Sequence, residues 1–540
     1  MLFNSYEFLF AFLPATLLLF FLAGRVSRDF ALGWLIVASL VFYAWWRPVN
    51  VPIIAASLAV NFTIARLLQR FAADRSKARL RGVLLAFGII FNVVYLGYFK
   101  YTNFLLGALN DVTGTQFALT QIILPLGLSF ITFQKIAFLI DVNSGRVESF
   151  TLRDYLLFVL FFPQLIAGPI VHYREMMPQF HQHPCRFDRR ALAVGLTMVC
   201  FGLFKKVVLA DGLAAFVTPV YLQATHDAVS LFPAWLAAIG FTLQIYFDFS
   251  GYSDMAAGIA LCFGVRLPLN FYSPLQASSI IDFWTRWHVT LSRFLTAYLY
   301  NPMLLAITRR RFARGLPGLG GHKATPGAFL QLLAGPLLVT MFISGIWHGA
   351  GYLFMVWGLL HGLYLTIDHG WRLLGHRLMP DKARYEAMMR PIGFVITFLA
   401  VVLSMVFFRA PTLRAAMTVL AGMSGLHGIE LPRLVADRIG AAHLPHFVAV
   451  ADSLGLKDFL QQNLWLLGLL FIALVMPNSI QILRSADPVL GAQERPANTG
   501  LVLRSLSWQP TPAWALFMAL LAAAAVMRMG GPSEFLYWQF

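Results

Sequence analysis

Long apolar runs recur along the whole chain, from Phe8 to Met529, and short polar connections separate them. A membrane-spanning helix needs about 20 mainly apolar residues, and backbone that faces lipid must satisfy its hydrogen bonds internally. The runs lack the short alternating pattern of membrane β-strands. The pattern therefore predicts an all-α polytopic integral membrane protein with roughly 11–13 transmembrane or re-entrant helices.

The expected spans cover residues 7–23, 30–46, 50–69, 82–98, 121–142, 152–168, 191–220, 231–248, 253–265, 328–344, 349–368, 391–408, 462–478 and 512–529. No repeat of fixed period and no Pro/Ser-rich linker divides the chain, so we interpret residues 1–540 as one integral domain. The first span has no positive region before it and no convincing cleavage site after it. It is therefore interpreted as a retained helix and not as a signal peptide.

Two segments depart from this pattern. In the segment 276–323, Phe283, Trp287, Leu291 and Leu295 recur at helical spacing, with arginines between them. This spacing predicts an amphipathic helix that lies in or dips into the cytoplasmic interface. The segment 424–461 is polar and is expected to lie outside the membrane.

Composition and charge support a membrane protein and predict its orientation. Hydrophobic residues make up 59% of the chain and charged residues 12%, whereas soluble domains carry about 25% charged residues. The net charge of +17 comes from short basic connections and not from a nucleic-acid-binding module. By the positive-inside rule the basic connections are cytoplasmic, while 101–120, which has no Lys or Arg, and the N-terminus are outside. The basic connections cover residues 70–81, 172–190, 284–323, 372–390 and 480–504.

Ionisable residues inside membranes are costly, so the few in these spans are informative. We expect Asp211, Asp248 and Asp254 to form internal ion pairs that set helix register. Lys205 and Lys206 are interpreted as marking a cytoplasmic helix end, with contact to a donor phosphate as the alternative.

His348 is the strongest candidate for chemistry. Gly345, Gly349 and Gly351 surround it, which favours a break in the helix, and a break in a membrane is tolerated where it lines a cavity. A neutral imidazole there could take the proton of an acceptor hydroxyl that attacks a thioester. Ser344 lacks a nucleophile-elbow pattern, so direct attack is preferred. A structural role is expected for His361.

Several kinds of site are missing from the sequence. There is no dinucleotide fingerprint, phosphate-binding loop or HExxH motif, and the three cysteines lack metal-ligand spacing. We expect no metal and no permanently bound cofactor.

Nine stretches make the chain resemble the membrane-bound O-acyltransferase family, in particular its bacterial polysaccharide-acetylating branch. They are FYAWWRP (42–48), LGYFKYTNF (96–104), LPLGLSFITFQKIAFLIDV (124–142), FFPQLIAGPIV (161–171), YFDFSGYSDMAAG (246–258), NFYSP (270–274), FWTRWHVTLSRFL (283–295), SGIWHGAGYLFMVWGLLHG (344–362) and FLYWQF (535–540). Each stretch is weak by itself, but their order and spacing are specific.

The resemblance implies a tunnel through the bilayer of a bacterial inner membrane. It implies that His348 is catalytic and that His288, the second catalytic candidate, lies near the cytoplasmic entrance. The acyl donor would be acetyl-CoA or another acyl-CoA. The acyl group would pass outward to an extracellular polysaccharide, through an extracytoplasmic transferase as partner.

The cytoplasmic mouth for the donor is expected at the amphipathic stretch, with the indoles of Trp284 and Trp287 at the membrane interface. The complete set of expected binding residues is Asp282, Trp284, Arg286, Trp287, Arg293, Trp347 and Asn270. After residue 300 the sequence is longer and more basic than is usual in this branch, which leaves donor identity open.

Three alternatives remain open at this point. The same chemistry could act on peptidoglycan or in a teichoic-acid alanylation route. A transporter or flippase would show two repeated halves with paired half-spans, and none is visible. A scaffold subunit of a polysaccharide export complex would need no chemistry at His348.

Overall fold

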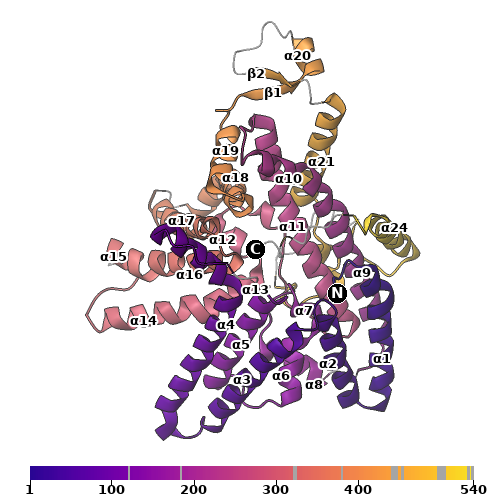
Figure 1. The fold of residues 1–540 in the computed structure, drawn as a ribbon, viewed down its shortest axis with the longest axis vertical. Coiled ribbons are helices and arrows are strands. Elements are labelled where there is room, and N and C mark those ends of the chain that lie inside the picture. The colour runs from indigo at the N-terminus through magenta and orange to yellow at the C-terminus, as the bar shows by residue number, and fades with distance from the viewer. Residues whose placement is uncertain are drawn as a thin grey trace.

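The structure is a computed structural model that describes residues 1–119, 122–182, 185–319, 325–378, 381–439, 448–451, 455–494, 506–531 and 536. Helices dominate these residues (Figure 1). The strands β1 (Ile429–Pro432) and β2 (Val448–Ala451) form one parallel pair, and they are the only strands in the described part of the chain. The predicted all-α class is confirmed.

The first half of the chain contains α1 (Leu13–Val26), α2 (Arg28–Ala44), α3 (Asn50–Arg70), α4 (Ala78–Thr113), α5 (Leu128–Asn143), α6 (Leu152–Leu160), α7 (Phe162–Leu165), α8 (Tyr173–Gln182), α9 (Arg189–Phe204), α10 (Asp211–Gln223) and α11 (Leu231–Cys262). The second half contains α12 (Ile280–Trp284), α13 (Val289–Leu295), α14 (Asn301–Phe312), α15 (Pro326–Phe329), α16 (Gly335–His348), α17 (Tyr352–Leu378), α18 (Lys382–Arg409), α19 (Leu413–Met423), α20 (Arg433–Ile439), α21 (Leu456–Leu474), α22 (Ser479–Ile482) and α24 (Pro512–Arg528). Short π-helical turns are η1 (Phe8–Phe12), η3 (Lys205–Ala210), η5 (Thr296–Tyr300) and η6 (Leu330–Ala334), and 3₁₀ turns are η2 (Arg75–Lys77), η4 (Pro274–Gln276) and η8 (Arg484–Ala486).

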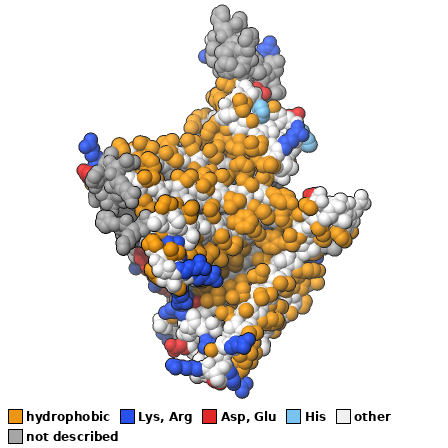
Figure 2. Space-filling view, turned by 90° about the vertical axis from the view of Figure 1, so that its left-hand side faces the viewer, with side chains coloured by type: hydrophobic (Ala, Val, Ile, Leu, Met, Phe, Trp, Pro, Cys, Tyr) orange, Lys and Arg blue, Asp and Glu red, His pale blue; other side chains and the backbone are white. Residues whose placement is uncertain are grey.

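Seven helical segments among the described residues are long and apolar enough to cross a membrane, fewer than the expected number of crossings. Several expected spans are shorter helices, such as α5 with 16 residues. The prediction of one span over 152–168 is wrong, because this stretch forms α6 and α7, which have 9 and 4 residues. Figure 2 shows hydrophobic side chains covering much of one face, as expected for a surface in contact with lipid.

The prediction of separate spans at 231–248 and 253–265 is also wrong, because α11 runs through both as one helix. Its two acidic residues are neutralised inside the protein. Asp248 lies 2.7 Å from Lys206 Nζ, and Asp254 lies 2.7 Å from Lys205 Nζ. Because paired charges can remain buried, the helix does not have to break where they occur.

The same contacts test the interpretation of the two lysines. Lys206 is 2% exposed and also reaches Asp211 at 2.7 Å, so it does not mark a cytoplasmic helix end. The expected internal ion pairing of the three aspartates is confirmed. Both lysines lie in η3, the π-helical turn between α9 and α10.

α9 and α11 pack at unusually short range through paired glycines. A Cβ added at Gly202 would lie 2.4 Å from the carbonyl oxygen of Gly251, and one added at Gly258 would lie 2.5 Å from that of Gly195. Small residues allow this close approach of helix backbones in membranes. α11 thereby becomes the buried centre around which the other helices pack.

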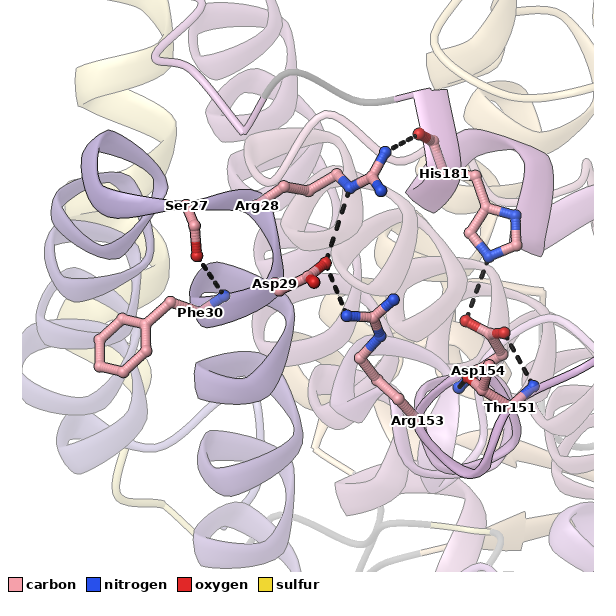
Figure 3. A network of polar contacts seen from close by, with 8 residues as sticks. All are labelled: Ser27, Arg28, Asp29, Phe30, Thr151, Arg153, Asp154 and His181. Atoms are coloured by element: carbon pink, nitrogen blue, oxygen red, sulfur yellow. Dashed lines mark hydrogen bonds and ion pairs between the residues drawn. The ribbon is translucent and has the colours of Figure 1, made fainter.

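Several connections predicted to be cytoplasmic meet at one end of the molecule, the lower end in Figure 1. There Asp29 of α2 pairs with Arg153 at 2.6 Å, and His181 Nε2 of α8 lies 3.1 Å from Asp154 of α6 (Figure 3). Close by, Gln69 donates to the carbonyl of Glu148, which connects the α3–α4 turn to the loop after α5. The strands β1 and β2, within the predicted extramembrane segment 424–461, lie at the opposite end (Figure 1).

Candidate active site

The helix α16 ends at His348, and α17 begins at Tyr352. The connection starts with Gly349 in an extended conformation, at φ −157° and ψ 152°. A side chain there would collide with the Phe354 ring, because an added Cβ would lie 2.1 Å from Phe354 Cε2. The expected break at this histidine is confirmed, and it places His348 at the exact C-terminus of a buried helix.

The C-terminal carbonyls of α16 are satisfied by α4. Lys100 Nζ donates to the carbonyls of Trp347 and His348, the latter at 3.0 Å, and Tyr101 Oη donates to that of Ile346 at 2.8 Å. The last carbonyls of a helix lack partners within it, and a cation is favourable at this end of the helix dipole. Sequence reasoning missed Lys100. The available signal was a lysine inside an apolar run, which is expensive unless it is partnered.

α16 and α17 form a tight hairpin that holds this terminus. A Cβ added at Gly345 would lie 2.2 Å from the carbonyl oxygen of Phe354, and one at Gly358 would lie 2.4 Å from that of Met341. The two backbones therefore nearly touch at two successive positions along the hairpin. This contact gives His348 a rigid support.

The stretch around His288 is not the single amphipathic helix that the sequence predicts. α12 ends at Trp284 and α13 starts at Val289, with His288 between them in the left-handed region at φ 43° and ψ 51°. This conformation is strained for a residue with a side chain, and such strain is concentrated at functional sites. The Val289 N–H donates to the Asn270 carbonyl at 2.9 Å, which holds the turn.

The side chain of Asn270 sets the orientation of the His288 ring. Its Oδ1 lies 3.1 Å from His288 Nδ1, and it accepts from the Thr290 hydroxyl at 2.8 Å and from the Thr290 N–H at 3.4 Å. A backbone N–H can only donate, so the atom facing it is the amide oxygen. His288 Nδ1 therefore carries a hydrogen. Asn270 is thus occupied inside the protein, which differs from its expected contact with the donor.

The other nitrogen of His288 is available for chemistry. Nε2 is buried and has no hydrogen-bond partner among the described residues. In the neutral ring it carries a lone pair and can accept a proton. A buried acceptor without a partner is costly, so a hydrogen-bond donor from a bound group would stabilise this position.

The structure brings His288 and His348 together. Their ring centroids are 6.4 Å apart, and the side chains are 0% and 6% exposed. His288 is therefore buried beside His348. Aromatic rings surround the pair: Trp347, Trp357 and Phe408 lie 4.9, 5.1 and 5.4 Å from His348, and Phe249 lies 4.7 Å from His288.

A cavity of about 380 Å³ leads to His348. Lys100, Trp347 and Trp46 line it together with residues 122–127 of the connection from α4 to α5 and with the first residues of α5, 128–130. This connection lies at the end of α4 away from the α3–α4 turn. The cavity therefore approaches His348 from the side that the charge pattern predicts to be extracytoplasmic.

His361 has the structural role that was expected. It is 0% exposed; its Nδ1 accepts from Trp284 Nε1 at 3.3 Å, and its Nε2 lies 2.9 Å from Ser404 Oγ. The Ser404 hydroxyl donates to the Val401 carbonyl at 2.8 Å, so His361 Nε2 is the donor to Ser404. Both ring nitrogens are satisfied, and neither is left for substrate.

The two tryptophans of the predicted donor mouth lie elsewhere than expected. Trp284 and Trp287 are 8% and 4% exposed, so the prediction that they sit at the membrane interface is wrong. Trp284 packs against His361, and Trp287 stacks on Phe283 at 5.6 Å. Because the chain turns at His288, both rings of this short segment point into the core.

The charged residues of this stretch remain partly exposed and form ion pairs. Arg286 lies 2.7 Å from Asp282, one helical turn earlier, with both side chains about one quarter exposed (26% and 28%). Arg293 pairs with Glu175 of α8, at the end where the predicted cytoplasmic connections meet. The guanidinium groups are therefore near a surface, but a donor would have to compete with these carboxylates.

Comparison with known proteins agrees with this architecture. The sequence model described as "MBOAT, membrane-bound O-acyltransferase family" matches residues 145–316. A protein of Pseudomonas aeruginosa named "Probable alginate O-acetylase AlgI" is 36% identical over 100% of both chains. This chain belongs to the membrane-bound O-acyltransferase family. It is accordingly a multi-pass bacterial membrane protein and an acyltransferase, and it needs an acyl donor.

Other relatives act on different acceptors. A "Peptidoglycan O-acetyltransferase" of Helicobacter pylori is 39% identical over 80% of this chain and 82% of that protein. A "Teichoic acid D-alanyltransferase" of Streptococcus thermophilus is 25% identical over 55% of this chain and 70% of that protein. The matching family stretch at 535–540 falls outside the described residues except for Leu536, which is buried.

Proposed function

We propose that this chain transfers an acetyl group from acetyl-CoA, bound at the cytoplasmic side, to hydroxyl groups of an extracellular polysaccharide. The observation that carries this proposal is the buried pair of His288 and His348, with a cavity that reaches His348 from the opposite side. The full-length similarity to AlgI-type proteins supports acetyl as the group and a polysaccharide as the acceptor.

In the proposed reaction His348 acts as the general base. Its imidazole takes the proton of an acceptor hydroxyl while the hydroxyl oxygen attacks the thioester carbonyl. The carbon–sulfur bond then breaks, and the leaving thiolate takes up the proton, so the step needs no oxidant or reductant. A well-placed base of this kind contributes about 10²–10⁴-fold to the rate.

His288 supplies the second polar group of the site. Asn270 holds its Nδ1–H, which leaves the Nε2 lone pair facing the shared buried space. In that position Nε2 can accept a hydrogen bond from the incoming hydroxyl or from His348 after it has taken the proton. Burial of both rings excludes water that would otherwise hydrolyse the thioester.

The donor would enter from the end that carries Arg286 and Arg293. Charge-assisted hydrogen bonds from arginine suit the phosphates of a CoA thioester. Asp282 and Glu175 hold these side chains in place before the donor arrives. The alternative donor contact at Lys205 and Lys206 is disfavoured, because both lysines are committed to internal ion pairs.

The cavity on the acceptor side is modest in size. A cavity of about 380 Å³ is near the lower end for small-ligand pockets. It suits one sugar residue or one side chain of a partner better than a polymer strand. This size supports an extracytoplasmic transferase that collects the acetyl group and delivers it to the polysaccharide.

The test is substitution of His348 by alanine and by glutamine. Both variants are expected to lower O-acetylation of the polysaccharide by about 10²–10⁴-fold at matched protein level, because no base remains. The measurement is base-labile acetate released from purified polysaccharide. His226→Ala is the matched control, since His226 is exposed in the turn after α10. Normal acetylation in the His348 variants would refute the proposal.

Peptidoglycan is the second candidate acceptor, favoured by the 39% identity to the Helicobacter pylori relative. The two candidates differ in where the acetyl ester appears. Acetate is measured separately in purified peptidoglycan and in secreted polysaccharide, with and without the gene. Loss of ester from the peptidoglycan fraction alone would replace the polysaccharide by this acceptor.

A further inference from the structure

A second cavity lies on the flank of the molecule, between α14 on one side and η6 with α16 on the other. Its volume is about 500 Å³, larger than that of the cavity at His348. In Figure 1 α14 projects from the left-hand side, and it is joined to the body through η5. The crevice is therefore reached from the side of the protein, where lipid would be.

One face of α14 lines this crevice and changes character along its length. Met303, Ile307 and Arg310 have spacings that put them on one face of the helix. Arg314 also lines the crevice, from the turn that follows the end of α14 at Phe312. The opposite wall is apolar and includes Leu330, Pro336 and Val339. The crevice thus has an apolar part followed by a cationic end.

The cationic end is held in place and is not neutralised by the protein. Arg311 is 6% exposed and donates to the Pro317 carbonyl at 2.8 Å and to Gln331 at 2.7 Å, which folds the chain back after α14. Gly315, at φ 66°, permits this reversal. Arg310 and Arg314 are exposed beside it, and no carboxylate of the described residues pairs with them.

We propose that this crevice binds an anionic phospholipid, with an acyl chain against Met303, Ile307 and Val339 and the phosphate at Arg310 and Arg314. Basic pockets between membrane helices on the cytoplasmic side recognise anionic headgroups. Figure 2, which views this side of the molecule, shows a group of Lys and Arg side chains bordered by hydrophobic surface.

Free phosphate is the other possible source of the same anion, and the apolar wall argues against it. Phosphate or the phosphates of CoA would contact the arginines but not the apolar part of the crevice. A phospholipid would contact both the arginines and the apolar part. Because α16 carries His348 at its far end, an occupant here would also brace the helix that supports the site.

The experiment uses the full chain, purified in mild detergent, and measures binding of dioleoyl phosphatidylglycerol by native mass spectrometry and by thermal shift. Dioleoyl phosphatidylcholine has the same chains without net charge, and inorganic phosphate and acetyl-CoA test the free anions. The variants are R310Q/R314Q, which removes the charges of the cationic end, and I307W, which fills the apolar part of the crevice. The control is R75Q/R79Q, which removes two exposed arginines from the α3–α4 turn.

Wild type and R75Q/R79Q are expected to bind phosphatidylglycerol alike. R310Q/R314Q should bind it about 10-fold more weakly, because each arginine adds to the attraction of an anionic headgroup. I307W should also weaken lipid binding although it keeps both arginines. All proteins must elute as single species from gel filtration, which separates loss of binding from loss of fold.

Equal binding of phosphatidylglycerol by R310Q/R314Q and wild type would overturn the proposal. So would displacement of the lipid by inorganic phosphate or by acetyl-CoA, which would make the crevice a free-anion or donor site. Normal phosphatidylglycerol binding by I307W would contradict the part of the proposal that concerns the acyl chain.

Discussion

At the scale of single residues, one amide decides which nitrogen of His288 can react. Asn270 Oδ1 receives the hydrogen of His288 Nδ1, while Asn270 Nδ2 donates to Ser253 Oγ at 3.0 Å. A flip of the Asn270 amide would place its NH2 group opposite the Thr290 N–H. Two donors would then face each other, so the orientation with Oδ1 toward Thr290 is fixed. The tautomer of His288 therefore depends on Asn270 as a positioning residue.

Asn270→Leu is expected to lower acyl transfer by about 10²-fold, since a misplaced ring loses its geometry with the acceptor. Asn270→Asp keeps an oxygen opposite Nδ1 and should retain more activity. Its acid limb should move to higher pH, because a carboxylate favours the charged imidazolium. The measurement is the pH profile of acetate transfer at matched protein level.

Ser253→Ala is the control for this prediction. It removes the hydrogen bond on the other side of the amide and leaves Oδ1 opposite His288. Its pH profile should match that of wild type. Identical rates and pH profiles for Asn270→Asp and Asn270→Leu would show that the amide has only a packing role.

At the scale of elements, the α16–α17 hairpin positions His348 through backbone contact. Gly358 lies against Met341, and any side chain at Gly358 would push the two helices apart. The carbonyls that α16 exposes at its end are held by α4, a third element. The position of His348 therefore depends on the contact of α16 with α17 and on its contact with α4.

Gly358→Ala is expected to destabilise the protein by about 1–3 kcal/mol, the usual cost of an overpacked contact. The added Cβ would lie 2.4 Å from the Met341 carbonyl oxygen, so the backbone has to move. The measurement is the melting temperature and the monodisperse fraction in detergent. The control is Gly97→Ala in α4, where an added Cβ meets nothing within 4 Å. Equal stability of the two variants would contradict the packing argument.

At the scale of the whole molecule, two connections of different composition lie at opposite ends of the helices. The basic connection 70–81 lies at one end with the loop after α5, and the connection from α4 to α5 lies at the other. By the positive-inside rule the first end is cytoplasmic. The donor and acceptor approaches to the histidine pair would then be on opposite sides of the membrane.

Cysteine labelling tests this orientation. Lys77→Cys should be protected from a membrane-impermeant maleimide in intact spheroplasts and should react after permeabilisation. Thr115→Cys, exposed in the connection after α4, should react in both conditions. Cys185, Cys200 and Cys262 are replaced first to remove background. Labelling of position 77 from outside would reverse the assignment.

The sequence by itself determined what depends on local pattern. Apolar runs predicted the helical membrane class, and basic connections predicted which loops lie together, because bilayer thickness and loop charge act on each segment separately. The glycines around His348 predicted the break at that residue, since the effect of glycine on a helix is local. The same local logic suggested the internal pairing of Asp248 and Asp254, as a buried carboxylate needs a partner.

Only the tertiary structure decided which distant residues meet. His288 lies beside His348, and Lys100 holds the end of α16 from 248 residues away, which no periodicity along the chain encodes. The amphipathic spacing around Trp284 predicted one interfacial helix, but the hydrogen bonds of Asn270 to the turn at His288 bend the chain and bury both indoles. Contacts across such sequence separations form only when the helices pack, so the tautomer of His288 and the crevice beside α14 follow from the fold and not from the pattern.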